Sequence, residues 1–148
     1  MTDSNLLNLY SERILALTTA IPHQGKLEAP QAHVMKRSPL CGSTVTVDLN
    51  LGPDGRVSDF AQDVKACALG QASAAVAGAQ IIGRSRAELE AARDALKAML
   101  QGGPVPPAPF DGYEVLEPAR DYKNRHASIL LALEAAAAAA AEAEAKAA

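Results

Sequence analysis

Residues 44–51 read Thr-Val-Thr-Val-Asp-Leu-Asn-Leu and alternate strictly between polar and apolar side chains. A period of two puts the valines and leucines on one face of a β-strand and the polar residues on the other. Such a strand needs one covered face and is typical of an antiparallel sheet. The turn residues Gly-Pro-Asp-Gly at 52–55 predict a hairpin. A strand should therefore return over 57–64.

The residues around this hairpin extend the sheet. In the returning strand Phe60 and Val64 are in phase while Val57 is not, which predicts a β-bulge. A further edge strand is predicted over 32–37, ended by Ser38-Pro39. Together these segments predict a three-stranded antiparallel meander.

Helical spacing predicts most of the remaining chain. The first helix should carry an apolar stripe from Leu6 to Leu17, begin at Asp3 or Ser4 and end at Pro22. A Ser-Arg-Ala-Glu capping box at 85–88 starts another helix. We expect three helices after the sheet, over 68–82, from 85 to about 100, and from a start between Asp121 and Ser128.

Strands followed by helices predict an α+β fold, with an N-terminal helix first, a three-stranded antiparallel meander, and three helices packed on the sheet. We expect one domain over residues 1–134. The Ala-rich segment 135–148 is predicted to be a helical tail that frays in solvent, because it shows no large apolar face.

Composition excludes several functional classes. The chain has 148 residues, a formal net charge of −3 and 3% aromatic residues, so it lacks the basic charge and the stacking platforms of a nucleic-acid binder. The sequence contains no run of 18 apolar residues, so no membrane span is predicted. No export signal is visible either, so a cytoplasmic location is expected. In that reducing compartment two cysteines indicate a metal or redox pair.

Both cysteines are expected where elements end. Cys41 follows the first strand in a tight Ser-Pro-Leu-Cys-Gly loop, and Cys67 stands where the third strand gives way to a helix. Backbone N–H groups at a helix start favour a thiolate, and the sheet could bring the two sulfurs together. The alternative is that Cys67 is a small buried apolar residue and Cys41 an inactive loop thiol.

His126, at the start of the last helix, is the third candidate ligand, with a solvated or core role as the alternative. His23 and His33 are weaker candidates because neither has a nearby cysteine or carboxylate in a useful spacing. A thiol-dependent transferase with Cys67 as nucleophile would need His126 as its base. Hydrolase, nucleotide-binding and zinc-protease motifs are missing, so we expect a non-catalytic protein.

Four sequence features resemble the NifU/IscU/SufU family of iron–sulfur cluster scaffolds over about residues 6–134. They are the Ser-Pro-Leu-Cys-Gly loop, the Gly-Pro-Asp-Gly hairpin, Ala-Cys-Ala-Leu-Gly-Gln-Ala-Ser-Ala at a helix start, and Arg-X-X-Ser-Ile-X-Leu in the last helix. The resemblance identifies Cys41 and Cys67 with the family's first two cysteines. The family's Asp after Cys-Gly is Ser43 here. Its third cysteine corresponds to Ser128 in an ungapped match, or to Ala127 after a one-residue slip.

The resemblance implies a NifU-like scaffold that holds iron, zinc or a transient iron–sulfur cluster through Cys41 and Cys67. A cysteine desulfurase and cluster-acceptor proteins are the implied partners. Three interpretations of the ligand set remain open: His126 completes a site, two chains share a cluster as a homodimer, or the site is vestigial. In the last case the protein is a regulatory interaction module for a desulfurase or another scaffold, without bound metal.

Overall fold

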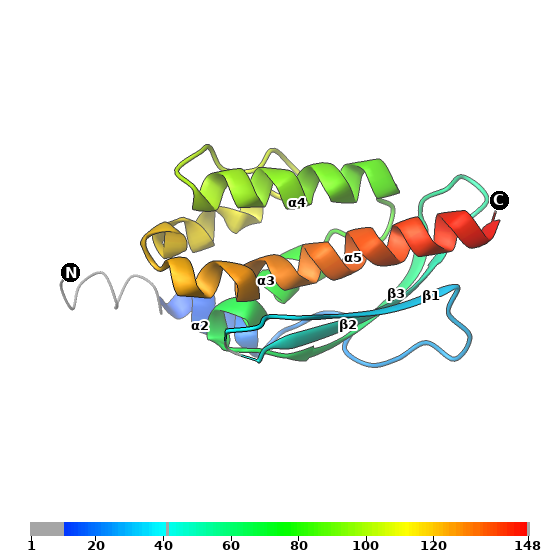
Figure 1. Ribbon diagram of the computed structural model, residues 1–148, viewed down its shortest axis with the longest axis horizontal. Coiled ribbons are helices and arrows are strands. Elements are labelled where there is room, and N and C mark those ends of the chain that lie inside the picture. Colours follow the sequence, from blue (N-terminus) through cyan, green and yellow to red (C-terminus); the bar gives the residue numbers. More distant parts are fainter. Residues whose placement is uncertain (1–10, 41, 148) are drawn as a thin grey trace.

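The computed structural model describes residues 11–40 and 42–147 and has an α+β architecture (Figure 1). A short helix precedes the sheet, and most of the helical structure follows it. The elements are α2 (Glu12–Thr18), β1 (Ala32–Arg37), β2 (Thr44–Leu51), β3 (Val57–Lys65), α3 (Ala68–Gly78), α4 (Arg86–Leu100), the 3-10 helices η1 (Asp111–Asp121) and η2 (Lys123–Arg125), and α5 (His126–Ala147).

The sheet is the predicted meander, with strand order β1-β2-β3 and both pairs antiparallel. Val45, Val47 and Leu49 are fully buried, so the alternation in β2 does separate a core face from an outer face. The bulge is confirmed as a register shift at Asn50/Leu51, which pairs Leu51 with Val57. The register therefore follows from the hydrophobic pattern and the turn.

Helices α3 and α5 contact each other, and α5 packs along β1 and β2, while α4 lies on the side of α5 away from the sheet (Figure 1). The capping box is confirmed: Ser85 accepts from the Glu88 backbone N–H, and the Glu88 carboxylate accepts from the Ser85 N–H. These layers bury the large aliphatic side chains, among them Leu69, Leu89, Leu96, Ile129 and Leu133.

Several predicted boundaries were wrong. Helix α2 ends at Thr18, before the predicted end at Pro22, and it begins at Glu12 after the extended N-cap residue Ser11, where the sequence predicts an uninterrupted helix. The predicted start at Asp3 or Ser4, and Leu6, lie outside the described residues. Helix α3 ends at Gly78 instead of 82, and a turn follows that buries Ile81. The 3-10 helix η1 was not predicted, although it contributes the fully buried Tyr113 and Leu116.

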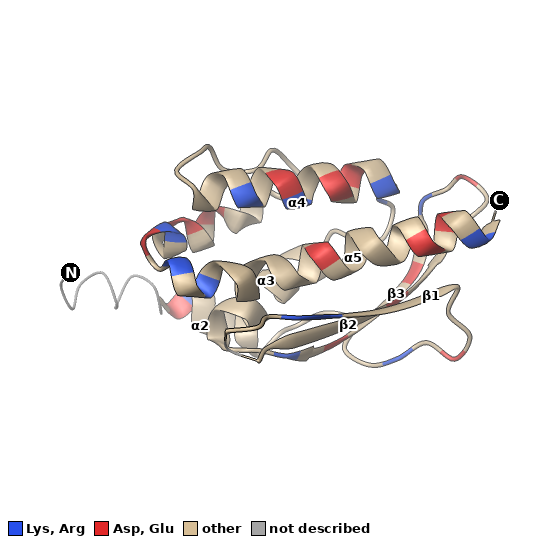
Figure 2. Cartoon of the chain, in the orientation of Figure 1, with Lys and Arg blue, Asp and Glu red and all other residues tan. Residues whose placement is uncertain are grey.

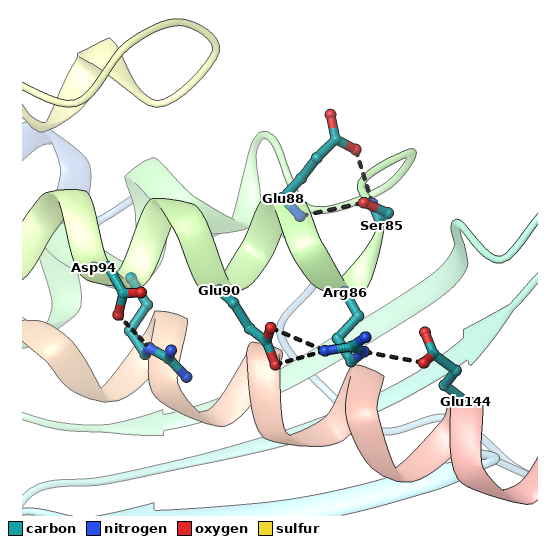
Figure 3. Close-up of polar contacts among 7 residues, drawn as sticks. Ser85, Arg86, Glu88, Glu90, Asp94 and Glu144 are labelled. Atoms are coloured by element: carbon teal, nitrogen blue, oxygen red, sulfur yellow. Dashed lines mark hydrogen bonds and ion pairs between the residues drawn. The ribbon is translucent and has the colours of Figure 1, made fainter.

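The Ala-rich segment is the largest correction, because it is not a solvated tail. Helix α5 continues to Ala147, and most of its alanines between 132 and 143 are buried. The small side chains let the helix backbone approach the sheet and its neighbouring helices closely. On the exposed side the Arg86 Nε of α4 donates to Glu144 at 3.1 Å, and Arg86 also pairs with Glu90 (Figure 3). A helix of small residues thus packs without large apolar side chains.

By length and mean hydropathy (1.3), residues 123–147 could cross a membrane, but 61% of the apolar window is buried inside the protein. A core helix passes the same test.

The segment between α2 and β1 covers part of the outer sheet face. The Gln62 N–H donates to the His23 carbonyl and the Gly25 N–H to the Gln62 carbonyl, so the segment follows the edge of β3. The Leu27 N–H then donates to the Asp48 carboxylate at 3.1 Å. Asp48 also pairs with His33, and it is 4% exposed. One half of the outer face is therefore covered.

Candidate functional site

Cys67 is the N-cap residue of α3, directly after β3, as the sequence predicts. Its backbone is extended (φ −64°, ψ 170°), and its side chain makes no capping hydrogen bond. The thiol is partly exposed and lies at the amide-rich start of the helix. It is therefore accessible for chemistry and not sealed in the core.

The side-chain partner of Cys67 is Ser128, in the first turn of α5, with 3.4 Å between Sγ and Oγ. Ser128 is 1% exposed. This contact needs Gly70: a Cβ at position 70 would lie 2.6 Å from the Ser128 Oγ. The ungapped sequence match that placed Ser128 at this position, rather than Ala127, therefore agrees with the geometry.

The Ser128 hydroxyl donates to the Ser43 Oγ at 3.1 Å. Because a hydroxyl has only one proton, Ser128 can then only accept from the Cys67 S–H. Ser43 is 4% exposed and comes from the segment between β1 and β2. The thiol and the two hydroxyls thus join three segments that are far apart in sequence.

Cys41 lies outside the described residues. On either side of it in sequence, the Ser38 N–H donates to the Ser43 carbonyl at 2.8 Å, and the Gly42 N–H donates to the Ser38 carbonyl at 2.9 Å. Gly42 has φ +70°, a conformation that favours glycine. The glycine of the Cys-Gly motif therefore stands in a left-handed conformation that suits glycine, and its N–H closes a turn back to Ser38.

His126 begins α5, but its Nε2 lies 3.0 Å from the Ala119 carbonyl and 3.1 Å from the Arg120 carbonyl. Both partners are acceptors, so Nε2 carries the proton and only Nδ1 remains for another ligand. His23 stacks edge-on against Phe60, with 5.7 Å between ring centroids. Among the described residues, the contact of Cys67 is with Ser128, so no thiol–imidazole pair for a transferase is formed.

A buried hydrogen-bond network behind Ser128 was missed by the sequence reasoning. Ser73 of α3 donates to the carbonyl of Ile129, and the Tyr113 hydroxyl donates to the Ser73 carbonyl at 2.9 Å. Burial raises the pKa of Tyr113, although its hydrogen bond to Ser73 opposes the shift. The network fixes the first turn of α5, and with it Ser128, against α3. In the sequence, the small-residue run of α3 was the only signal for it.

The described residues do not by themselves fit a resident zinc ion. No group of three or more His, Cys, Asp or Glu side chains in residues 11–40 and 42–147 could hold a metal. Beside Cys67 the available donors are neutral hydroxyls, whereas zinc prefers thiolate, imidazole and carboxylate ligands. The described part of the site offers one sulfur beside the Ser128 hydroxyl, at the backbone N–H groups of a helix start.

Comparisons with known proteins give a consistent result. The family profile described as the NifU-like N-terminal domain matches residues 9–147. A crystal structure of a nitrogen-fixing NifU-like protein (N-terminal) from Brucella abortus is 46% identical, covers 96% of this chain and 99% of its own, and superposes with a TM-score of 0.92.

A second structure, an iron–sulfur cluster assembly scaffold protein for the SUF system by its description, comes from Fervidobacterium islandicum. It is 23% identical, covers 90% of this chain and 98% of its own, with a TM-score of 0.79, and so supports the fold alone. No protein with a curated description matches the chain significantly.

Proposed function

From the premise that this chain belongs to the NifU-like N-terminal domain family, we propose that it is a non-catalytic scaffold or carrier in iron–sulfur cluster assembly. Iron, zinc or a transient cluster is its cargo, held through Cys41 and Cys67. The observation that carries the proposal is the partly exposed Cys67 thiol at the start of α3, beside the first turn of α5.

The geometry around Cys67 suits a thiolate that binds and releases cargo. Backbone N–H groups at the helix start favour negative charge on the sulfur. Ser128 now accepts from the thiol, but its hydroxyl can rotate to donate to a sulfur that carries cargo. His126 stays a proposed third ligand through Nδ1, since its Nε2 is already bonded.

The partners follow from the same premise. We propose that a cysteine desulfurase supplies sulfur, that cluster-acceptor proteins receive the product, and that the protein works in the reducing cytoplasm, where thiols persist. A homodimer that shares one cluster is part of the proposal, because a chain with two cysteines has half of the four thiolates that clusters usually use.

Anaerobic reconstitution with ferrous iron and sulfide tests the proposal. Wild-type protein should gain visible absorbance together with bound iron and sulfide, and Cys67→Ser should lose most of both. Ser58→Ala, an exposed change in β3, is a matched control and should behave as wild type. A wild-type protein that gains no cluster, or a Cys67→Ser protein that gains as much as wild type, would contradict the assignment.

One observation favours a second candidate, a regulatory module that binds a desulfurase or another scaffold without metal. The two side chains that follow Cys67 in the hydrogen-bond chain, Ser128 and Ser43, are neutral hydroxyls bonded to each other. Equal metal content in wild type, Cys41→Ser and Cys67→Ser, with desulfurase binding retained in all three, would favour this candidate over the scaffold.

A further inference from the structure

Half of the outer sheet face is accessible. The helices cover the face that carries Val45 and Val47, and the segment before β1 covers the outer face around Asp48. Toward the other end of the strands, Met35 is 57% exposed and the side chains of Arg37 and Lys65 are also exposed. This accessible half lies at the end of the sheet where β3 leads into Cys67.

The strand register arranges its charges. Arg37 pairs with Thr44, and Thr44 pairs with Lys65, so these three side chains form a row across all three strands on one face. Met35 stands two residues before Arg37 on β1, in the adjacent row of the same face, where it pairs with Thr46. Figure 2 shows the basic segments on β1 and at the end of β3. The row itself carries two positive charges although the whole chain carries −3, and the next row on this face ends in one carboxylate, Asp63, opposite Thr46.

The row lies close to Cys67 along the chain. Lys65 precedes Cys67 by two residues. The Arg37 guanidinium is folded toward the next loop, since a Cβ at Gly42 would lie 3.9 Å from its Nη2. Leu40, in that loop, is 74% exposed, more than any other large apolar residue in the described part of the chain. Along the chain Arg37 stands between the exposed apolar side chains of Met35 and Leu40, and protein interfaces are enriched in methionine and arginine contacts of this kind.

We propose that Met35, Arg37, Leu40, Thr44 and Lys65 form a docking surface for an acidic protein partner, the one that delivers sulfur to this end of the molecule. Carboxylates of the partner pair with Arg37 and Lys65, and apolar side chains of the partner contact Leu40 and Met35. The inference rests on the proposed function, because only a scaffold needs a sulfur donor beside Cys67. Opposite charges also speed the encounter and make it sensitive to salt.

The test measures binding of a purified cysteine desulfurase to the full chain at low and high salt. Arg37→Glu and Lys65→Glu should each weaken binding on the order of tenfold at low salt, mainly through slower association, and should flatten the salt dependence. Leu40→Ala should weaken binding at both salt concentrations equally. Lys97→Glu makes the same charge change on α4, beyond the opposite face, and should stay within about twofold of wild type.

Chemical reconstitution separates this inference from the proposed function, because ferrous iron and sulfide need no protein partner. Arg37→Glu and Lys65→Glu should take up as much iron and sulfide as wild type does. If both variants bind the desulfurase as tightly as wild type, with the same salt dependence, the docking surface is wrong whatever the cluster content. Failure of wild type to bind would also overturn it.

Discussion

At the scale of single residues, Gly70 determines how closely α5 approaches Cys67. A methyl group there would lie 2.6 Å from the Ser128 Oγ and 2.8 Å from the Ala66 Cβ. Overpacking of this kind costs about 1–3 kcal/mol, so Gly70→Ala should lower the free energy of unfolding by that amount in a denaturant titration. It should also separate Ser128 from Cys67.

Removing the Ser128 hydroxyl provides the control for the Gly70→Ala prediction. In a Ser128→Ala background the closest obstacle is gone, so Gly70→Ala should cost less than it does in wild type. Equal costs in the two backgrounds would show that the helices are separated by something other than this contact.

The carboxyl group of Glu88 should make the stability of the fold depend on pH. Its pKa is lowered by the hydrogen bond from the Ser85 backbone N–H and then by Arg56, while desolvation opposes the shift. A carboxyl with a lowered folded-state pKa adds stability above its unfolded pKa and loses it as the pH falls through the folded value. Glu88→Gln should therefore be less stable than wild type at pH 7, and the difference should shrink below about pH 4.

Thermal unfolding of both proteins across this pH range measures the effect. Glu114→Gln, an exposed change in η1, should follow wild type throughout. If the difference in stability between Glu88→Gln and wild type is constant with pH, the loss comes from altered hydrogen-bond geometry in the cap and not from the charge of Glu88.

At the scale of elements, the end of α5 supports the fold. Truncation after Ala135 removes five buried alanines: Ala136, Ala137, Ala139, Ala140 and Ala143. At about 0.8 kcal/mol for each buried methyl-sized group, the loss approaches 4 kcal/mol, a large part of the stability of a small domain. Truncation after Ala143 keeps all five and should cost little. Equal stability of the two truncated proteins, measured by denaturant titration, would contradict the packing.

The sheet could be predicted from the sequence because its signals are local. Alternation in 44–51, the turn at 52–55 and the phase of Val57 determine strands, register and bulge within one hairpin. The burial of 135–143 could not be predicted in this way. Alanine stripes have almost no hydrophobic contrast, so only the partners of the helix, far away in sequence, reveal which face is buried.

In the candidate site, too, local features could be predicted from the sequence and tertiary contacts could not. The position of Cys67 at a helix start follows from the strand before it and the small residues after it. Its neighbours Ser43 and Ser128 stand 24 residues before and 61 residues after it (67 − 43 = 24; 128 − 67 = 61), so their hydrogen bonds depend on tertiary packing. For the same reason the carbonyl partners of His126 were not foreseen, since they lie in the unpredicted helix η1.

At the scale of the whole molecule, the number of cysteines limits the stoichiometry of any cluster. One chain has two cysteines, and the residue beside Cys67 that would be the third ligand of the resembling family is the hydroxyl of Ser128. Because clusters are usually held by four thiolates, a cluster held by cysteines alone would need two chains, as the proposed homodimer provides. Reconstituted wild type should hold one cluster per two chains and elute as a dimer, by iron and sulfide analysis with light scattering.

Ser128→Cys raises the number of thiols that a single chain offers to a cluster. Its sulfur would replace an oxygen 3.4 Å from the Cys67 Sγ, so each chain would offer three thiols. We expect this variant to hold more cluster per chain than wild type and to form less dimer on reconstitution. Ser73→Cys, a buried change one layer deeper in α3, adds a thiol away from this contact and should leave the ratio unchanged. A wild-type protein with one cluster on each monomer would show that ligands other than four cysteine thiolates complete the site.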